Sequence, residues 1–289
     1  MKLARFTDGG PPELGVVARD SVISLTRAVP RWKDDMAALI AHWPEIEDEV
    51  RSIAASEREA SKCEAVQFLA PIARPGKIMG IGLNYADHIA ESKLTRPEHQ
   101  IWFAKTSTAV NGPNDPIQVP SVNSTADYEA ELVAVVGCGG RRIDRGSAMG
   151  AVFGYCVGND VSDRRLQHTT PQWTLGKSLD TYAPFGPWIT TADEVGDPHQ
   201  LDVRCFVNGQ LRQNSNTRHL VFNVWDQIAH LSQAMTLEPG DLVFTGTPGG
   251  VGAAMSPPQF LKAGDRVRIE IERLGAIEAA CVTEGGQAV

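Results

Sequence analysis

The sequence predicts a β-rich protein of the α+β class that is built in two parts. Beyond about residue 75, apolar stretches of strand length outnumber stretches with helical periodicity, which disfavours a doubly wound α/β protein. One clear amphipathic helix interrupts these strands. Because Pro71 and Pro75 mark a connection, we predict a small N-terminal domain over residues 1–70 and a larger domain over residues 71–289.

The N-terminal part begins with a predicted β-meander. Over residues 1–28 apolar and polar positions alternate, and the turn-forming segment Asp8-Gly9-Gly10-Pro11-Pro12 interrupts the alternation. From Trp32 to Ser56 apolar residues recur at helical spacing, but Pro44 should end or restart a helix. We therefore predict a pair of helices after the meander.

The larger part is predicted to consist mainly of strands, because short apolar stretches bounded by turn residues are typical of buried strands. These stretches are Lys77–Ile81, Ile101–Phe103, Tyr128–Val136, Ala151–Val157, Trp188–Thr190, Leu201–Val207, Asp241–Phe244 and Val267–Ile271, the last followed by a hairpin return through Gly275. Over Val221–Met235 apolar residues instead form one helical stripe, which ends before the turn segment Glu238-Pro239-Gly240-Asp241.

Composition and charge exclude several classes of partner. The formal net charge of −8 disfavours nucleic acid, because phosphate backbones are bound by clustered Lys and Arg. The N-terminus lacks an apolar stretch of signal-peptide length, and no run of apolar residues is long enough to span a membrane. We therefore expect a cytoplasmic protein with no membrane partner. The five cysteines show no Cys-x-x-Cys spacing, so we expect buried free thiols.

Three acidic residues at the ends of apolar strands could bind a cation. Glu129 and Glu131 open the apolar stretch Leu132–Val136 two residues apart, so their side chains point to one face of a strand. Asp160 closes another apolar strand, and Asp127 adds a further acid. A Glu-x-Glu pair is often only a solvated strand edge, but buried carboxylates need a cation to offset their repulsion. Carboxylates are hard ligands, which favours Mg²⁺, Mn²⁺ or Ca²⁺ over zinc or copper.

A second candidate group follows the first predicted strand of the larger part. His88 and Glu91 lie three residues apart in a short predicted helix that Asn84 can cap, so their side chains can form a hydrogen bond. A histidine oriented by a carboxylate can act as the general base for a water molecule, although such pairs also occur as surface interactions. The segment Gly80-Ile81-Gly82 does not begin a dinucleotide-binding loop, because Tyr85 stands where the third glycine is required.

A third group combines basic and polar residues with a glycine-rich segment. Its members are Lys105, Arg164, Gln167, Lys177 and Thr247, the last within Thr245-Gly246-Thr247-Pro248-Gly249-Gly250. The segment lacks the Lys-Ser/Thr ending of a phosphate-binding P-loop and does not open a helix. Its backbone N–H groups and Thr247 could instead hold a substrate carboxylate. Each lysine, taken alone, could equally be a surface residue.

Several segments, taken in order, resemble the fumarylacetoacetate hydrolase superfamily. They are GLNYADHIAE, IWFAKTSTAVNGPNDPI, DYEAELVAVVG, GYCVGNDVSDRRLQ, QWTLGKSLDTYAPFGPW, VNGQLRQNSNT and LEPGDLVFTGTPGGVG, and the similarity covers roughly residues 75–285. The resemblance implies a mixed β-roll catalytic domain that follows a small N-terminal α/β cap domain, and it implies a homodimer.

The resemblance also implies roles for individual residues. It places Mg²⁺ or Mn²⁺ on Glu129, Glu131 and Asp160; it implies catalytic roles for His88, Glu91, Lys105 and Lys177, and substrate contacts for Arg164, Gln167 and Thr247. One segment departs from the family pattern. Many members have Ser-Ala-Arg-Asp where this chain has Ser162-Asp163-Arg164-Arg165, which affects local helix contacts and substrate choice rather than metal binding.

Members of this superfamily act on 1,3-dicarbonyl compounds or 2-oxo acids. The resemblance therefore implies a hydrolase that cleaves a C–C bond in an acylpyruvate or related β-diketo acid through a metal-chelated enolate, with His88 deprotonating the attacking water. An oxaloacetate-type decarboxylase or a 2-hydroxy-dienoate isomerase could use the same enolate, and a non-catalytic metal-binding protein would keep the cation as a structural element. We expect the loops at Ser92–Gln100 and Arg165–Trp173 to select the acyl group.

Overall fold

The structure is a computed structural model that describes residues 1–56, 60–92, 95–121 and 124–285. Its strands are β1 (Lys2–Thr7), β2 (Glu13–Ala18), β3 (Ser21–Ser24), β4 (Ala60–Lys62), β5 (Gln67–Leu69), β6 (Ile78–Gly82), β7 (Ile101–Lys105), β8 (Val110–Asn111), β9 (Ile117–Val119), β10 (Ala126–Asp127), β11 (Ala130–Val136), β12 (Val152–Asn159), β13 (Ser162–Asp163), β14 (Ala183–Thr191), β15 (Asp202–Val207), β16 (Gln210–Asn216), β17 (Leu242–Phe244), β18 (Arg266–Ile271) and β19 (Gly275–Thr283).

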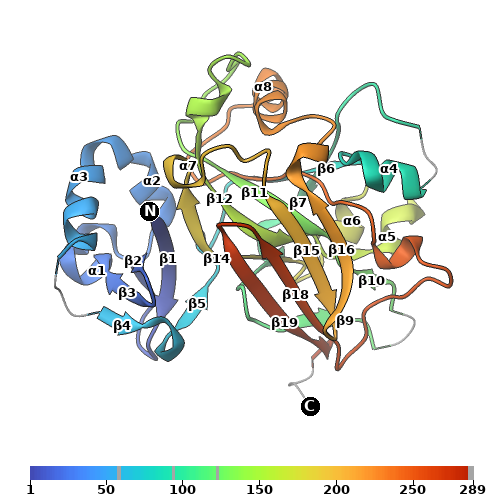
Figure 1. The fold of residues 1–289 in the computed structure, drawn as a ribbon, viewed down its shortest axis with the longest axis horizontal. Coiled ribbons are helices and arrows are strands. Elements are labelled where there is room, and N and C mark those ends of the chain that lie inside the picture. Colours follow the sequence, from blue (N-terminus) through green and yellow to red (C-terminus); the bar gives the residue numbers. More distant parts are fainter. Residues whose placement is uncertain (57–59, 93–94, 122–123, 286–289) are drawn as a thin grey trace.

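The α-helices lie around the periphery of the sheets (Figure 1). They are α1 (Leu25–Ala28), α2 (Met36–Ala41), α3 (Trp43–Ala54), α4 (Ala86–Ser92), α5 (Arg164–Thr169), α6 (Thr174–Lys177), α7 (Ala192–Val195) and α8 (Val224–Ala234). The protein therefore has the predicted β-rich α+β fold. Among the described residues, no helix combines the length and apolar character that crossing a bilayer requires.

One long sheet runs through both parts of the chain. Its strand order is β4-β3-β2-β1-β14-β12-β11-β17-β6-β7, with β5 attached to β1 and β8 attached to β14. The junction is the antiparallel pairing of β1 with β14, in which Leu3 lies opposite Ile189. The N-terminal meander is thus hydrogen-bonded to the sheet of the larger part, and the division at residue 70 stays a prediction.

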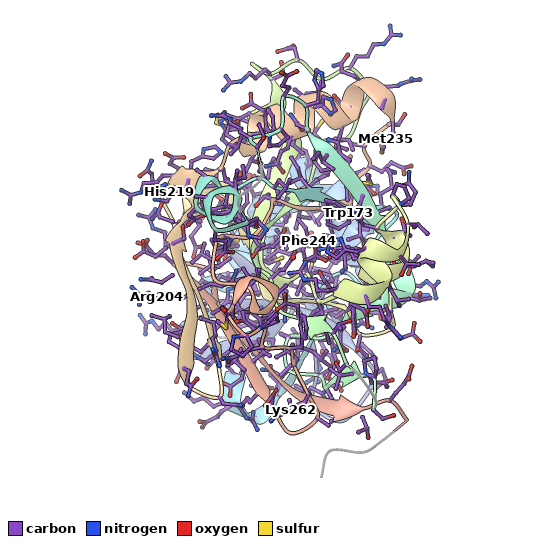
Figure 2. All side chains as sticks on the ribbon, turned by 90° about the vertical axis from the view of Figure 1, so that its right-hand side faces the viewer. Trp173, Arg204, His219, Met235, Phe244 and Lys262 are labelled. Atoms are coloured by element: carbon purple, nitrogen blue, oxygen red, sulfur yellow. The ribbon has the colours of Figure 1, made fainter. Side chains whose placement is uncertain are left out.

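A second sheet packs against the first and completes the main core. Its order is β16-β15-β18-β19-β9, and its buried side chains join those of β11, β12 and α8 in one apolar cluster. The middle strand β11 is buried on both faces: Leu132 and Ala134 contribute to this cluster, whereas Val133 and Val135 contribute to a cluster shared with the N-terminal part. Figure 2 shows Phe244 of the second cluster inside the molecule, with Arg204 at its periphery.

Local sequence signals explain where the two main helices begin. Pro44 lies in the first turn of α3, directly after α2 ends, so the proline separates the helical pair as expected. Helix α8 begins after Asn223, whose side chain accepts a hydrogen bond from the N–H of Asp226 in a capping box.

Strand β16 was not predicted, because its sequence QLRQNSN is polar and lies at the edge of the second sheet.

Two expectations about single residues were wrong. Asn84 does not cap α4: its side-chain oxygen accepts the N–H of Phe222, and its amide nitrogen donates to the carbonyl oxygens of Phe222 and Thr245, so the side chain ties together three loops. The cysteines are free as expected, but they are not all buried: Cys138 is exposed and Cys63 is half-buried. The apolar surroundings of Cys138 in the sequence gave no sign that it follows the end of β11 at the surface.

Replacement of Leu3 tests whether the N-terminal part unfolds with the rest. Leu3 is fully buried in the cluster that both parts share, so Leu3→Ala should lower the free energy of unfolding by about 2–5 kcal/mol in a single transition. Urea unfolding followed by tryptophan fluorescence measures the change. The exposed Leu211 provides the control, since Leu211→Ala should change stability by less than about 0.5 kcal/mol. Two separate transitions, only one of them shifted, would instead support independent domains.

Candidate active site and metal centre

The three predicted metal ligands are brought together by the pairing of β11 with β12. The strands are antiparallel, with Ala130 opposite Asn159, so the start of one strand lies beside the end of the other. The N–H of Asp160 accordingly donates to the backbone oxygen of Glu129 at 2.9 Å. One carboxylate oxygen from each of Glu129, Glu131 and Asp160 lies within 4.8 Å of the others, and all three residues are buried. The structure therefore assembles the carboxylate cluster that the sequence suggested.

Two buried lysines form ion pairs with these carboxylates. Lys177 at the end of α6 places its ammonium group 2.8 Å from Glu129 Oε2 and 2.5 Å from Asp160 Oδ2. Lys105 at the end of β7 donates to the other oxygen of Asp160 and to the carbonyl oxygen of Val161. Burial opposes the charge of both lysines; it lowers the pKa of Lys105, whereas the carboxylates of Asp160 and Glu129 raise the pKa of Lys177.

Arg164 also forms ion pairs with carboxylates of the cluster. Its Nε donates to Asp127 Oδ2 at 2.9 Å, and its Nη1 lies 2.6 Å from Glu129 Oε1. The same Nη1 donates to Gln167 Oε1 at 3.0 Å, which fixes the side chain of Gln167. Although burial opposes its ionisation, the charges of Lys177 and Arg164 lower the pKa of Glu129. Glu129 is therefore ionised with bonds to both of its oxygens.

The charge balance at this cluster fits a divalent cation. Four carboxylates (Asp127, Glu129, Glu131 and Asp160) face three cations (Lys105, Arg164 and Lys177), so four minus three leaves one negative charge when all are ionised. Across the described part of the chain Glu131 has no ion-pair partner, and burial together with Asp160 and Glu129 raises its pKa well above the ordinary value. Hard oxygen donors and excess negative charge suit Mg²⁺ or Mn²⁺.

The His88 and Glu91 pair also forms as expected. His88 Nδ1 lies 2.9 Å from Glu91 Oε1, and Glu91 Oε2 accepts a hydrogen bond from the N–H of Gly250 at 2.8 Å. When His88 Nδ1 donates to the carboxylate, Nε2 is left to accept a proton. The glycine-rich segment therefore positions the pair through its backbone.

The same segment and the two residues Gly252 and Ala253 that follow it donate backbone N–H groups to two acids of the cluster. Gly246 N–H donates to Glu131 Oε2 at 2.8 Å, while Gly252 and Ala253 donate to the two oxygens of Asp127 at 2.8 and 3.0 Å. The sequence suggested that these N–H groups could hold a substrate carboxylate. In the structure the N–H groups of Gly246, Gly249 and Gly250 bond protein carboxylates instead, and Thr247 Oγ1 accepts a hydrogen bond from Gln213.

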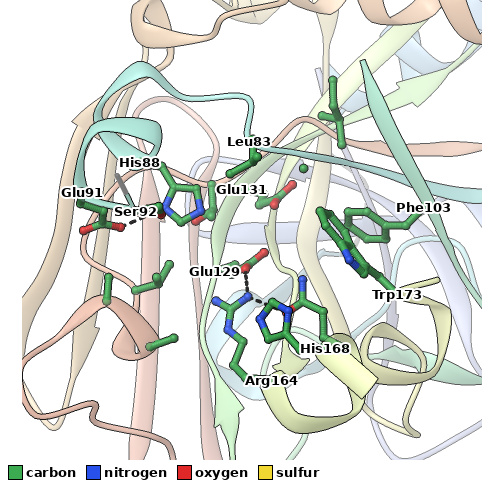
Figure 3. Close-up of a pocket in the computed structure, with 17 residues that line it drawn as sticks. Leu83, His88, Glu91, Ser92, Phe103, Glu129, Glu131, Arg164, His168 and Trp173 are labelled. Carbon is green, nitrogen blue, oxygen red and sulfur yellow. Dashed lines mark hydrogen bonds and ion pairs between the residues drawn. The ribbon is translucent and has the colours of Figure 1, made fainter. Parts of the chain in front are cut away.

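A cavity of about 400 Å³ opens over the cluster. Figure 3 shows His88 and Glu91 on one side of it, Phe103 and Trp173 on the other, and Glu129 between them. Of the predicted site residues, those that line the cavity are His88, Glu91, Glu129, Glu131, Arg164, Gln167 and Thr247. Lys105, Lys177 and Asp160 are not part of this lining; the two lysines contact the cluster through its carboxylates.

Several lining residues were not named as candidates from the sequence. His168 and Trp173 fall within Arg165–Trp173, and Ser92 begins Ser92–Gln100, the two segments that were expected to be loops selecting the acyl group. The structure instead places His168 in α5 and Ser92 in α4, and residues 93–94 lie outside the described residues. His168 could have been found, because it lies four residues after Arg164 on the same helix and so shares its face. Phe103 and Leu83 gave no comparable signal, since apolar residues in or after a buried strand are usually core residues.

Comparison with known proteins shows the family to which the chain belongs. The family model described as fumarylacetoacetate (FAA) hydrolase C-terminal matches residues 77–282. The chain is 41% identical over 283 residues, 96% of this chain and 89% of the relative, to a mitochondrial oxaloacetate tautomerase of Xenopus laevis. A fumarylacetoacetate hydrolase from Exiguobacterium antarcticum has a similar structure, with a TM-score of 0.86, 34% identity and coverage of 98% and 100% of the two chains.

A further solved structure bears on the metal. Maleylpyruvate hydrolase from Sphingobium sp. SYK-6, in complex with manganese (II) ion and pyruvate, is similar with a TM-score of 0.83 and 34% identity, over 99% of this chain and 100% of that one. A similar fold can therefore hold a manganese ion together with a 2-oxo acid.

Neutralising Glu131 tests the metal centre. Glu131→Gln removes the carboxylate that has no protein cation beside it in the described structure, so we expect at least about a tenfold loss of Mn²⁺ affinity in isothermal titration calorimetry. Glu278→Gln on β19 is the matched control and should bind Mn²⁺ like the unmodified protein. Equal affinities for both variants would rule out Glu131 as a ligand.

Proposed function

The chain belongs to the fumarylacetoacetate hydrolase family, and from that premise we propose that it hydrolyses a C–C bond in an acylpyruvate or a related β-diketo acid with the help of a divalent cation. Within this family the chain is an enzyme, and its relatives and structural neighbours include hydrolases, isomerases and oxaloacetate tautomerases. The observation that supports hydrolysis is the His88 and Glu91 pair beside the carboxylate cluster, because hydrolysis needs a base that activates water.

His88 and Glu91 have different roles in the proposed reaction. Glu91 holds His88 so that Nε2 can accept a proton from water, and the resulting hydroxide adds to the acyl carbonyl. The bond between that carbonyl carbon and C3 of the pyruvate unit then breaks, and its electron pair passes to the pyruvate unit as an enolate. Protonation at C3 completes the conversion of acylpyruvate and water into a carboxylic acid and pyruvate.

The cation would be held by Glu129, Glu131 and Asp160, and when bound it supplies positive charge that favours the enolate. Lys105 and Lys177 contact two of these carboxylates directly, so in this proposal they orient the cluster as well as add positive charge. Mg²⁺ and Mn²⁺ both suit the oxygen donors. The homodimer and the cytoplasmic location that we inferred from the sequence stay expectations.

Oxaloacetate tautomerisation is a second candidate, favoured by the 41% identity to a protein with that name. Interconversion of keto and enol forms moves a proton between carbon and oxygen and consumes no water. His88 could carry that proton from the same position. Decarboxylation of oxaloacetate and isomerisation of a 2-hydroxy-dienoate need the same enolate, so they belong to this alternative.

Removal of the imidazole tests the proposed base. His88→Ala should lower kcat for hydrolysis of acetylpyruvate at least about a hundredfold, the usual scale for loss of a general base. The reaction is followed by the loss of absorbance of the enolised diketone. His42→Ala, which changes an exposed histidine of the N-terminal part, is the control and should keep full activity. Unchanged turnover in the His88 variant would contradict the assignment.

Removal of the cation separates an enzyme from a non-catalytic metal-binding protein. EDTA treatment should abolish acetylpyruvate and oxaloacetate turnover, and Mn²⁺ or Mg²⁺ should restore it, because the cation held by Glu129, Glu131 and Asp160 would supply the positive charge that favours the enolate. Circular dichroism before and after treatment reports whether the fold survives. Restored thermal stability without turnover of either compound would favour a structural role for the cation.

A further inference from the structure

We propose, on the basis of the hydrolytic function above, that Ser215 is a positioning residue, which holds His88 over the metal cluster through a hydrogen bond to Asp87. Ser215 lies on the polar edge strand β16, and Asp87 directly precedes His88 in α4. His88 lines the cavity (Figure 3), whereas Ser215 and Asp87 are not part of its lining. Both residues would therefore act on the reaction through His88 and without touching the substrate.

The first support is the weak apolar anchoring of α4, the helix that carries His88. The helix is seven residues long, which is too short for a helix to be stable by itself. Within α4, all of which the structure describes, Ile89 is the single buried residue. The orientation of His88 therefore depends on polar contacts between this helix and its neighbours.

The second support is the set of bonds at Asp87, which accepts three hydrogen bonds at the start of α4. Its Oδ1 accepts the N–H of His88 at 2.8 Å and the N–H of Gly249 at 3.3 Å. Its Oδ2 accepts the hydroxyl of Ser215 at 2.6 Å. Hydrogen bonds to an ionised carboxylate are stronger than bonds between neutral groups. Asp87 thus fixes the backbone of His88 at a point separate from the bond that Glu91 makes to its ring.

The third support is the connection between β16 and the strand that carries two metal ligands. Gln213 lies two residues before Ser215, so its side chain points to the same face of β16, and it is fully buried. Its Oε1 accepts the N–H of Ala130, the residue between Glu129 and Glu131, at 2.9 Å. Its Nε2 donates to the glycine-rich segment. One face of β16 therefore joins the metal cluster to α4, and it would set the position of the base relative to the cation.

The first experiment removes the hydroxyl of Ser215 and nothing else. Ser215→Ala should lower kcat for acetylpyruvate hydrolysis at saturating Mn²⁺ about tenfold, because a displaced base transfers its proton less efficiently. KM and the Mn²⁺ affinity in isothermal titration calorimetry should stay within about twofold of the unmodified values, since the cavity lining and the metal ligands are unchanged.

Asn214 provides the matched control for this variant. It lies next to Ser215 on β16, points to the opposite face and is exposed. Asn214→Ala should therefore keep the kcat of the unmodified enzyme. Circular dichroism of both variants reports whether the sheet is intact.

The second experiment shows whether Ser215 acts through the base. In a His88→Ala background, Ser215→Ala should change the residual kcat by less than about twofold, because the group that Ser215 positions is gone. In an Asp87→Ala background the effect of Ser215→Ala should also vanish, since the hydroxyl has lost the carboxylate that it holds. A general structural role would lower kcat by the same factor in every background.

The outcomes separate this role from the proposed hydrolysis. An unchanged kcat in Ser215→Ala, or an equal loss in Asn214→Ala, overturns the role of Ser215 while hydrolysis stands. A loss that persists in the His88→Ala background, or that reflects only weaker Mn²⁺ binding, overturns it as well. If the folded, Mn²⁺-loaded enzyme does not cleave acetylpyruvate, or if His88→Ala keeps full turnover, the proposed reaction or its base is wrong and the role of Ser215 fails with it.

Discussion

The packing of several carboxylates into a buried corner is the constraint on which the rest of the site depends. Burial of an ionised group is costly unless opposite charges and hydrogen bonds offset the loss of water. Here β11 and β12 deliver Glu129, Glu131 and Asp160 to one place, and side chains from β7, α5 and α6 arrive to compensate them. Among the described residues, Glu131 has no cationic partner, whereas the other carboxylates of the cluster do. The unpaired carboxylate makes this corner suited to a metal cation.

Backbone N–H groups complete the compensation. The segment from Gly246 to Ala253 directs its N–H groups at carboxylates from β11, α4 and β10, and so joins the metal cluster and the His88 and Glu91 pair in one network. Gly250 adopts a φ of +103°, and a Cβ at that position would lie 2.1 Å from the carbonyl oxygen of Arg212. A side chain there would displace the N–H that holds Glu91. The glycine-rich sequence thus reflects close approach between backbones rather than phosphate binding.

Much of the fold and the composition of the site could be predicted from the sequence. The strands were recognisable because they are apolar and short, and the carboxylate cluster because acids at the ends of buried strands are unusual. The polar edge strand β16 could not be predicted from apolar residues, since edge strands need not be apolar. The role of each site residue depends on contacts between positions far apart in the chain, and no local sequence pattern encodes them. An example is Lys177, which forms ion pairs with both Glu129 and Asp160.

The pairing of β1 with β14 has a consequence for any shorter form of the chain. Lys2 and Leu3 pair with Thr190 and Ile189 at the edge of β14, and β14 in turn pairs with β12, the strand that Asp160 directly follows. A chain that began at β6 would present that edge with open N–H and C=O groups, ready to add a strand from another molecule. By pairing with this edge of β14, the N-terminal meander should protect the sheet that carries the active site from aggregation.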